Sequence, residues 1–224
     1  MPTDEGYDWW STIYDEEDNP LVLLEQEKFI RMLGDVHGLK IADLGCGTGR
    51  HTLRMATAGA RVIGVDFSDG MLVKARAKIK ANETYFIKHD LAQPLPFKSE
   101  MFDRVTCCLV LDHITNLRAL FSEMKRICVA DGFILISVMH PAMLLKGVEA
   151  QFTEPVSGQK IRPCSVPNQI SDYVMAAMRA GLVIDEMREH IVDRQLAERS
   201  PRAVKYLGFP LLLLMRLRKF SRQI

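Results

Sequence analysis

Cysteine is scarce in this 224-residue sequence, and its spacing suits neither metal binding nor a disulfide framework. The five cysteines, at positions 46, 107, 108, 128 and 164, form no CxxC pair. An odd number without a repeated spacing predicts reduced thiols and argues against disulfides or a zinc site. We therefore expect a cytoplasmic protein that holds no metal.

Long hydrophobic runs are missing as well. The apolar stretch Phe209 to Met215 is far shorter than the roughly 20 residues that a membrane-spanning helix needs. The first 27 residues contain nine acidic and no basic side chains, which is unlike a signal or transit peptide. The sequence thus predicts a soluble chain without a membrane partner.

Each end of the chain lacks charge of one sign. Residues 1–27 contain no Lys or Arg, whereas residues 199–224 contain seven basic and no acidic side chains. The simplest interpretation is two solvated ends that attract each other. The alternative is a basic rim beside an anionic substrate. Over the whole chain the net charge is +1, so no general attraction to nucleic acid or anionic membranes is expected.

Strand and helix patterns alternate from about residue 39 onward. Five short apolar runs have the pattern of buried parallel strands: 39–44, 61–67, 84–91, 102–111 and 133–139. Helical patterns follow most of these runs. This order predicts an α/β protein with a mostly parallel sheet that helices cover on both faces.

The remaining segments fit around this sheet within a single domain of residues 1–224. Residues 1–35 are expected to form a helical lid that precedes the sheet. The segment 141–168, which is rich in Pro and Gly, is expected to be an insertion that covers the substrate site. The apolar run 209–217 is expected to be the final strand.

A glycine-rich turn follows the first predicted strand. Gly45, Gly47 and Gly49 allow the backbone to turn tightly and to approach a ligand at the start of the next helix. A dinucleotide fingerprint would place its third glycine at position 50, which is Arg, so the spacing disfavours a nicotinamide-dependent oxidoreductase. The tighter turn leaves room for a methionine moiety instead of a pyrophosphate.

An acidic residue, Asp66, ends the second predicted strand, 21 residues after Gly45. A carboxylate there can accept hydrogen bonds from two ribose hydroxyls, and leaving these unpaired in a closed site would cost about 1–3 kcal/mol. The alternative role is to help start the helix that follows Ser68. Together with the glycines, Asp66 favours a nucleoside-containing ligand.

Several segments resemble the motifs of the class I S-adenosylmethionine-dependent methyltransferases, in particular a small-molecule "type 11"-like subset. The matching segments are DLGCGTG at 43–49, VIGVDFS at 62–68, HDL at 89–91 with LPF at 95–97 and FD at 102–103, and LDHI at 111–114. The resemblance implies a Rossmann-like, doubly wound sheet of seven mostly parallel strands with an antiparallel last strand. It also implies S-adenosylmethionine as the methyl donor and S-adenosylhomocysteine as the product.

The resemblance further implies a set of cofactor-binding residues. Asp43 would orient the amino group of the cofactor, Asp66 would hold its ribose, and Asp90 would bind its adenine amino group. Tyr14 belongs to a group of N-terminal aromatics that relatives use as a lid, although ordinary packing is the alternative. The other implied residues are Leu44, Gly45, Cys46, Gly47, Phe67, Met71, Leu91, Cys107 and Leu109.

Three residues are candidates for catalysis. Methyl transfer from a sulfonium is an in-line displacement, so the enzyme mainly positions the acceptor and excludes water, but an oxygen or nitrogen acceptor can also need a base. Asp112 and His113 follow the fourth predicted strand, and His140 follows the fifth. A hydrogen-bonded structural role is the alternative for both histidines. His140 is favoured because His140-Pro141 resembles a feature of some small-molecule methyltransferases and leads into the insertion.

Two motifs of nucleic-acid methyltransferases are missing after the fourth strand. The segment 106–112 contains neither a Pro-Cys pair nor an Asn/Asp-Pro-Pro-aromatic sequence. This absence and the near-neutral charge predict no nucleic-acid partner. We expect methyl transfer to the oxygen, nitrogen or carbon of a small molecule by a monomer or homodimer. The alternatives are a methyltransferase of protein or RNA and a non-catalytic cofactor-binding protein of the same fold.

Overall fold

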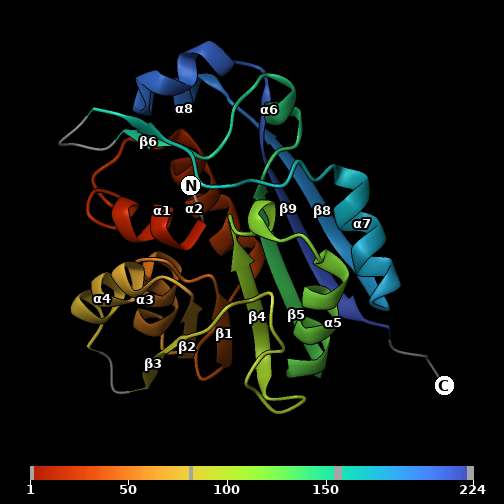
Figure 1. Cartoon of the computed structure of the whole chain (residues 1–224). Helices are drawn as coiled ribbons and strands as arrows, with labels where there is room; N and C mark the ends of the chain where they lie inside the picture. The colour runs from red at the N-terminus through yellow and green to blue at the C-terminus, as the bar shows by residue number, and fades with distance from the viewer. Residues whose placement is uncertain (1–2, 81–82, 154–157, 221–224) are drawn as a thin grey trace.

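A seven-stranded sheet forms the centre of the computed structural model, which describes residues 3–80, 83–153 and 158–220 (Figure 1). Its strands are β1 (Lys40–Leu44), β2 (Arg61–Asp66), β3 (Thr84–Lys88), β4 (Phe102–Cys108), β5 (Cys128–Met139), β8 (Leu182–Ile191) and β9 (Pro210–Lys219). Their spatial order is β3-β2-β1-β4-β5-β9-β8. The pairs from β3 to β5 are parallel, whereas β9 is antiparallel to both of its neighbours. The Rossmann-like fold predicted from the sequence is confirmed, including the antiparallel last strand.

One strand starts earlier than the apolar pattern predicts. β5 begins at Cys128, five residues before the predicted start at Phe133. Cys128 pairs with Phe102 at the beginning of β4, and a register shift follows this pair. Ala130 and Asp131 are exposed in this irregular stretch, so no apolar pattern marks it in the sequence.

Helices connect and cover the strands. They are α1 (Thr3–Trp10), α2 (Pro20–Leu33), α3 (Arg50–Thr57), α4 (Asp69–Lys78), α5 (Leu117–Ile127), α6 (Ala142–Leu145), α7 (Ile170–Arg179) and α8 (Arg194–Arg199), with the 3-10 turns η1 (Leu111–His113) and η2 (Pro201–Tyr206). Polar side chains cap several of their N-termini: Asn19, Ser68, Asn116 and Asp193 accept backbone N–H bonds at the starts of α2, α4, α5 and α8. Among the described helices, none has the length and apolar character needed to cross a bilayer.

The alternation of side chains along β9 separates two cores. Leu212 and Leu214 pack with α2 and α3 on one face of the sheet. Leu213 and Met215 pack with α5 and α7 on the opposite face. Successive residues of β9 therefore face opposite helix layers. Both faces of the strand are buried, which explains why its sequence is continuously apolar even though it runs antiparallel to its neighbours.

The carboxyl ends of the parallel strands open toward a group of covering segments (Figure 1). These segments are α1, residues 141–153 and 158–168, and the turn formed by α8 and η2. The region 141–168 contains α6 and a small antiparallel hairpin of β6 (Phe152–Thr153) and β7 (Lys160–Ile161). Ligands of doubly wound sheets bind at this edge, so the covering segments enclose the candidate site.

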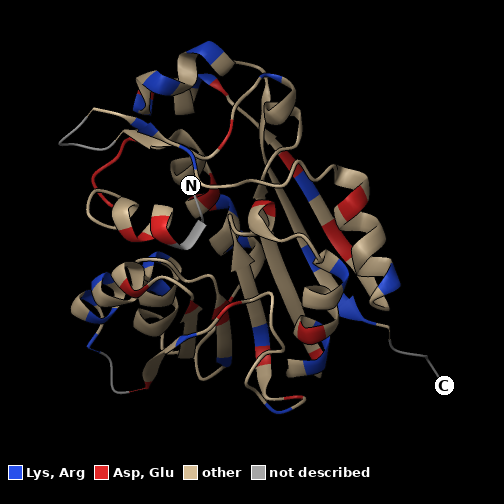
Figure 2. Cartoon of the chain, viewed as in Figure 1, with Lys and Arg blue, Asp and Glu red and all other residues tan. Residues whose placement is uncertain are grey.

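The acidic N-terminal segment and the basic tail meet in the folded chain. Figure 2 shows acidic residues in the segment after α1 and basic residues on α8 and η2. Arg199 forms an ion pair with Glu27, and Arg202 Nη1 donates a 2.8 Å hydrogen bond to the carbonyl of Asp18. The attraction between the two ends that the charge pattern predicts is thus present.

Candidate active site

The glycine turn after β1 adopts backbone conformations that side chains disfavour. Gly45 has a φ of +69°, and a Cβ atom there would lie 2.2 Å from Cγ2 of Val110. Gly47 has a φ of +54°, but a Cβ atom there would meet nothing within 4 Å. Gly45 is therefore required by packing, whereas Gly47 leaves open space on the ligand side of the turn.

A first cavity of about 510 Å³ extends from this turn across the ends of β2, β3 and β4. Nine of its lining residues were expected at the ligand site from the sequence: Tyr14, Gly45, Gly47, Asp66, Phe67, Met71, Asp90, Leu91 and Leu109. Asp90 is exposed, and its Oδ1 accepts a 2.9 Å hydrogen bond from the Ala92 N–H, which leaves Oδ2 available. The cavity thus combines an open glycine turn, apolar walls and the carboxylates of Asp8, Asp66 and Asp90.

Asp66 connects the glycine turn to the start of α4. Its Oδ2 accepts a 2.8 Å hydrogen bond from the Gly47 N–H, and its Oδ1 accepts a 3.0 Å bond from the Ser68 N–H. Burial raises the pKa of this carboxyl to about 6, although the backbone N–H groups oppose the shift. Each carboxylate oxygen can accept a further hydrogen bond. The helix-start contact is thus present, and the side chain still faces the cavity.

A small cavity of about 40 Å³ adjoins the other side of the glycine turn. Asp43, Cys46 and Arg50 line it. Asp43 is buried, and its carboxylate accepts hydrogen bonds from the hydroxyls of Thr52 (2.6 Å) and Thr106 (2.8 Å). This end of the site therefore holds an immobilised carboxylate and a guanidinium close together, as the charged ends of an amino acid require.

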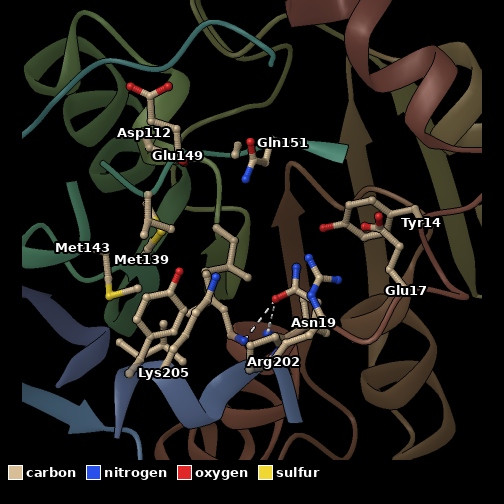
Figure 3. Close-up of a pocket in the computed structure, with 18 of the residues that line it drawn as sticks. Tyr14, Glu17, Asn19, Asp112, Met139, Met143, Glu149, Gln151, Arg202 and Lys205 are labelled. Carbon is tan, nitrogen blue, oxygen red and sulfur yellow. Dashed lines mark hydrogen bonds between the residues drawn. The ribbon is translucent and has the colours of Figure 1, made fainter. Parts of the chain in front are cut away.

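A second cavity of about 520 Å³ meets the first cavity at Tyr7, Tyr14 and Leu109, which line both (Figure 3). The start of α2, the region around α6 and the turn η2 form its other walls. Asp112 lies in this wall, and its Oδ1 is buried without a hydrogen-bond partner among the described residues. Burial raises the pKa of Asp112, and the neighbouring His113 partly offsets the shift.

His113 lines the first cavity and is held by two hydrogen bonds. Its Nδ1 lies 2.7 Å from the carbonyl oxygen of Cys164, and its Nε2 lies 2.8 Å from the hydroxyl of Tyr7. The side chains of Asp112 and His113 approach within 3.8 Å. Two of the three catalytic candidates are therefore brought together at the junction of the two cavities.

Comparison with known proteins identifies the family. A family model described as "Methyltransferase domain" matches residues 42–136. An uncharacterized methyltransferase of Emericella nidulans is 30% identical over 239 residues, a match that covers 88% of this chain and 83% of that protein. The chain belongs to the class I S-adenosylmethionine-dependent methyltransferases. Solved structures with the same fold include complexes with S-adenosylhomocysteine and with S-adenosylmethionine, the cofactor of this family.

Two further matches agree with this assignment. The structure of an S-adenosylmethionine dependent methyltransferase from Mesorhizobium loti has a TM-score of 0.74 at 23% identity and covers 87% of this chain and 97% of that one. A demethylmenaquinone methyltransferase of Clavibacter sepedonicus is 34% identical over 106 residues, which are 47% of this chain and 43% of that protein. The second match thus spans less than half of either chain and concerns the shared domain.

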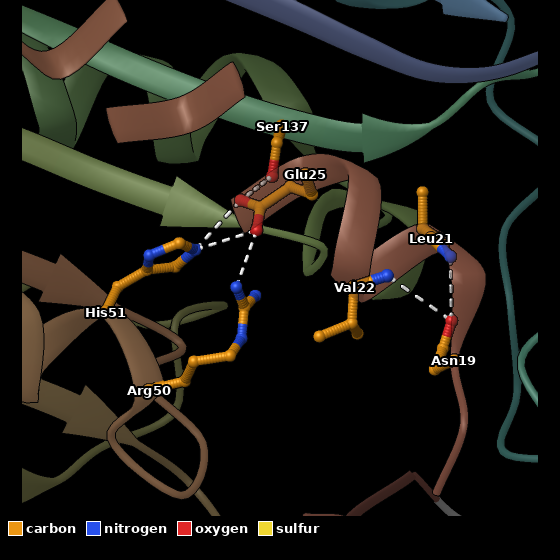
Figure 4. A network of polar contacts seen from close by, with 7 residues as sticks. All are labelled: Asn19, Leu21, Val22, Glu25, Arg50, His51 and Ser137. Carbon is orange, nitrogen blue, oxygen red and sulfur yellow. Dashed lines mark hydrogen bonds and ion pairs between the residues drawn. The ribbon is translucent and has the colours of Figure 1, made fainter. Parts of the chain in front are cut away.

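A buried ion-pair network lies behind the small cavity of the methyltransferase (Figure 4). Glu25 of α2 is fully buried, and its two oxygens lie 2.9 and 2.8 Å from Nε2 of His51. Arg50 Nη1 and Ser137 Oγ donate further bonds of 2.8 and 3.0 Å. Burial alone would raise the pKa of Glu25, but His51 and Arg50 together lower it to about 2. The network joins α2, α3 and β5 through one carboxylate.

His140 does not occupy the position expected of a base. Its Nε2 lies 2.7 Å from Oε1 of Glu189, and its Nδ1 accepts a 3.1 Å hydrogen bond from the Ala142 N–H. It is 5% exposed and is not among the described residues that line either large cavity. Both ring nitrogens are thus engaged in holding the turn after β5, and the structure corrects the prediction that His140 faces the acceptor.

The side chains of Leu44 and Cys107 are also misplaced by the prediction. Both side chains are completely buried in the hydrophobic core, with 0% solvent exposure, and do not face a cavity. Cys108, and not Cys107, lines the first cavity and the small cavity. The two cysteines face opposite sides of β4, as successive strand residues do, and Leu109, with a φ of +57°, ends the extended conformation. Burial raises the pKa of the Cys108 thiol well above its usual value.

Several residues that line the cavities were not among the predicted site residues, although Tyr7 belongs to the group of N-terminal aromatics expected to form a lid. Tyr7 lies at the junction of the first and second cavities, and Arg50 lines the small cavity. Arg202 and Lys205 of η2 line the second cavity. Arg202 and Lys205 belong to the basic C-terminal segment, for which a basic rim beside an anionic substrate was one of the two interpretations. Nothing in the local sequence distinguishes Tyr7 from the neighbouring aromatics.

Proposed function

We propose that this methyltransferase transfers the methyl group to a small-molecule acceptor. The observation that carries the proposal is the second cavity, which meets the first at Tyr7, Tyr14 and Leu109. Its volume of about 520 Å³ is within the range of cavities that bind small molecules, about 300–1,000 Å³. The demethylmenaquinone methyltransferase among the relatives also has a small-molecule acceptor in its name.

The first cavity and the small cavity fit S-adenosylmethionine. Asp66 would accept hydrogen bonds from the ribose hydroxyls, and Asp90 with Leu91 would contact adenine. Asp43 and Arg50 would face the amino and carboxylate groups of the methionine part, because they line the small cavity with complementary charges. When bound, the cofactor supplies a methyl group that its positively charged sulfur already activates. The chain then has to position an acceptor and to remove its proton.

Charged residues at opposite sides of the second cavity indicate the acceptor class. Asp112 and Glu149 lie on one side, and Arg202 and Lys205 of η2 lie on the other (Figure 3). Glu17 also lines the cavity, and its carboxylate accepts a 2.9 Å hydrogen bond from Trp10 Nε1. One Arg202 nitrogen donates to the Asp18 carbonyl, and a guanidinium has further N–H donors available. We therefore propose an acceptor with an anionic group at the η2 side and a hydroxyl or amine near Asp112.

Removing the positive charge of η2 should weaken binding of an anionic acceptor. A charge-assisted hydrogen bond contributes about 1.5–3 kcal/mol, so Arg202→Ala should raise the acceptor KM by about tenfold or more. Arg199→Ala is the matched control, because Arg199 points to Glu27 instead. Steady-state kinetics with the anionic acceptor and its neutral ester would show the loss only for the anion. An equal loss for both compounds would contradict the charge assignment.

Replacing Asp112 by asparagine should affect the acceptor and not the cofactor. The change keeps the shape of the side chain but removes the charged hydrogen-bond acceptor at the unpartnered Oδ1. We expect the acceptor KM of Asp112→Asn to rise about tenfold, while calorimetry with S-adenosylhomocysteine gives an unchanged Kd. A wild-type KM in this variant would remove Asp112 from the acceptor site.

The acceptor class can be tested with the radiolabelled methyl group of S-adenosylmethionine. The chain is incubated with pooled metabolites, total protein and total RNA, and label is counted in each fraction. The proposal predicts label in the small-molecule fraction and loss of that label in Arg202→Ala with Lys205→Ala. Label confined to protein or RNA would replace it with the second candidate, a macromolecular methyltransferase whose substrate lies along the basic tail.

A further inference from the structure

Three distant segments meet in one chain of hydrogen bonds beside the two large cavities. Tyr7 belongs to α1, His113 to η1, and Cys164 to the segment that follows β7. The Tyr7 hydroxyl is 2.8 Å from His113 Nε2, and His113 Nδ1 is 2.7 Å from the Cys164 carbonyl oxygen. Tyr7 lines both cavities, so this series of hydrogen bonds begins where the methyl donor and the methyl acceptor would meet.

The direction of these hydrogen bonds follows from the chemistry of the two ends. A carbonyl oxygen only accepts, so Nδ1 of His113 must carry a proton. In the neutral ring Nε2 then has a free lone pair, and it accepts the hydroxyl proton of Tyr7. The backbone thus selects a tautomer in which His113 is ready to take a proton from Tyr7. The Tyr7 oxygen in turn keeps a lone pair for another donor.

We propose that Tyr7 is a catalytic residue that takes the proton of the acceptor while its own proton passes to His113. The inference rests on the proposed methylation of a hydroxyl or amine. The acceptor lone pair forms the bond to the methyl carbon, and the electron pair of the broken carbon–sulfur bond stays on sulfur. The acceptor proton moves to the Tyr7 oxygen, and the Tyr7 proton moves to Nε2. His113 becomes an imidazolium and later releases this proton to water.

The environment of Tyr7 favours a relay over a free tyrosinate. Burial raises the pKa of Tyr7 well above its usual value, and Asp112, Tyr14 and Asp66 raise it further. A tyrosinate would therefore be costly, whereas simultaneous loss of the hydroxyl proton to His113 avoids it. Asp112 Oδ2 lies 3.8 Å from Nε2, and its negative charge would stabilise the imidazolium. The relay thus gives the buried carboxylate a role after proton transfer.

The attachment of α1 does not depend on the Tyr7 hydroxyl. Asp8 accepts hydrogen bonds from the Ser68 hydroxyl and, at 3.0 Å, from the Gly70 N–H at the start of α4. Trp10 is buried and stacks on Phe152 with ring centroids 5.0 Å apart. These contacts remain in a Tyr7→Phe variant, so its effect on proton transfer can be separated from an effect on the lid.

Tyr7→Phe should lower kcat about 100-fold at saturating cofactor and acceptor, the lower end of the effect of a general base. The Kd for S-adenosylhomocysteine should stay within about threefold, because α1 remains attached. Tyr85→Phe is the matched control, since Tyr85 is 62% exposed on β3 and should retain wild-type kinetics. A wild-type kcat in Tyr7→Phe would contradict the relay. A kcat that returns to the wild-type value at higher cofactor concentration would also contradict it, and would indicate that the Tyr7 hydroxyl only holds α1 in place.

His113 supplies a readout that a structural role would not change. His113→Ala should lower kcat as Tyr7→Phe does, because the Tyr7 proton then has no neighbouring acceptor. Nitrogen-15 NMR, assigned with His113→Ala, should show the ring proton on Nδ1. A proton on Nε2 in the neutral ring would overturn the relay whatever the acceptor is.

These outcomes separate the relay from the proposed function. Failure of the wild-type chain to methylate any small molecule would count against the proposed function. Wild-type turnover of a small molecule that both variants reproduce would count against the relay alone. Reduced kcat in both variants with the Nδ1 tautomer in the NMR spectrum would support both.

Discussion

Replacing Glu25 with alanine should lower the free energy of unfolding by about 3–5 kcal/mol, as expected when one partner of a buried ion pair is removed. The carboxylate accepts hydrogen bonds from His51, Arg50 and Ser137, and the change leaves the buried His51 and Ser137 and the partly buried Arg50 without it. Urea unfolding followed by circular dichroism measures the loss. Because Arg50 also lines the small cavity, weaker cofactor binding should accompany the loss of stability.

Glu27 provides the matched control on the same helix. It pairs with Arg199 at the surface, and exposed ion pairs contribute about 1 kcal/mol or less. Glu27→Ala should therefore unfold almost like the wild type. Glu25→Gln, which keeps the volume of the side chain, covers the case in which Glu25→Ala does not fold. A loss below about 1 kcal/mol in both Glu25 variants would show that the network does not stabilise the fold.

The Glu25 network also predicts how stability depends on pH. An unfolded glutamate titrates near pH 4.3, whereas His51 and Arg50, acting against burial, bring the folded pKa to about 2. The folded state thus binds fewer protons in this window, so the contribution is complete above pH 4.3 and is lost as pH falls toward 2. The unfolding free energy of the wild type should fall more steeply here than that of Glu25→Gln. Parallel curves would contradict the assignment.

Asp66→Ala should raise the Kd for S-adenosylhomocysteine about 10- to 100-fold, which corresponds to hydrogen bonds of about 1.5–3 kcal/mol to a charged group. The change removes the proposed ribose acceptor and also the bond that holds the Gly47 N–H. Isothermal titration calorimetry measures the Kd. Binding should also weaken as pH falls through about 6, where the Asp66 carboxyl becomes protonated because burial raises its pKa.

Asp103 is the control for this change. Its carboxylate likewise accepts a backbone bond, 2.8 Å from the Lys40 N–H, but it lies at the opposite end of the strands. Asp103→Ala should bind S-adenosylhomocysteine with wild-type affinity. A Kd within threefold of the wild type in Asp66→Ala would remove Asp66 from the ribose site.

The donor side of the site was predictable because its contacts are local. The glycine turn, Asp43 and Asp66 follow consecutive parallel strands, and parallel strands bring their carboxyl ends to one edge. This brings the turn and the end of β2 together, and the Gly47 N–H donates a 2.8 Å hydrogen bond to Oδ2 of Asp66, a contact that the sequence did not predict. The same reasoning places Asp112 and His113 after β4. The antiparallel last strand came from the family resemblance and not from local pattern.

The acceptor side depends on contacts between segments far apart in the sequence. His140 is engaged by Glu189, 49 residues later, and Tyr7 reaches His113, 106 residues later. No local pattern reports such pairs, because they depend on how the covering segments fold over the sheet. On β4 the side chain of Cys107 faces the core, whereas Cys108, for which the sequence predicted no role, lines the first cavity. The prediction therefore failed where tertiary contacts replace periodicity.

A crystal structure of the complex with S-adenosylhomocysteine is the most direct test that the first cavity holds the cofactor and that the methyl group passes into the second cavity. The account predicts ribose hydroxyls within hydrogen-bonding distance of Asp66, adenine beside Asp90 and Leu91, and the methionine part between Asp43 and Arg50. The sulfur atom should face the second cavity between Tyr14 and Leu109. A ligand in the first cavity whose sulfur points away from the second cavity would contradict the proposed transfer between the two.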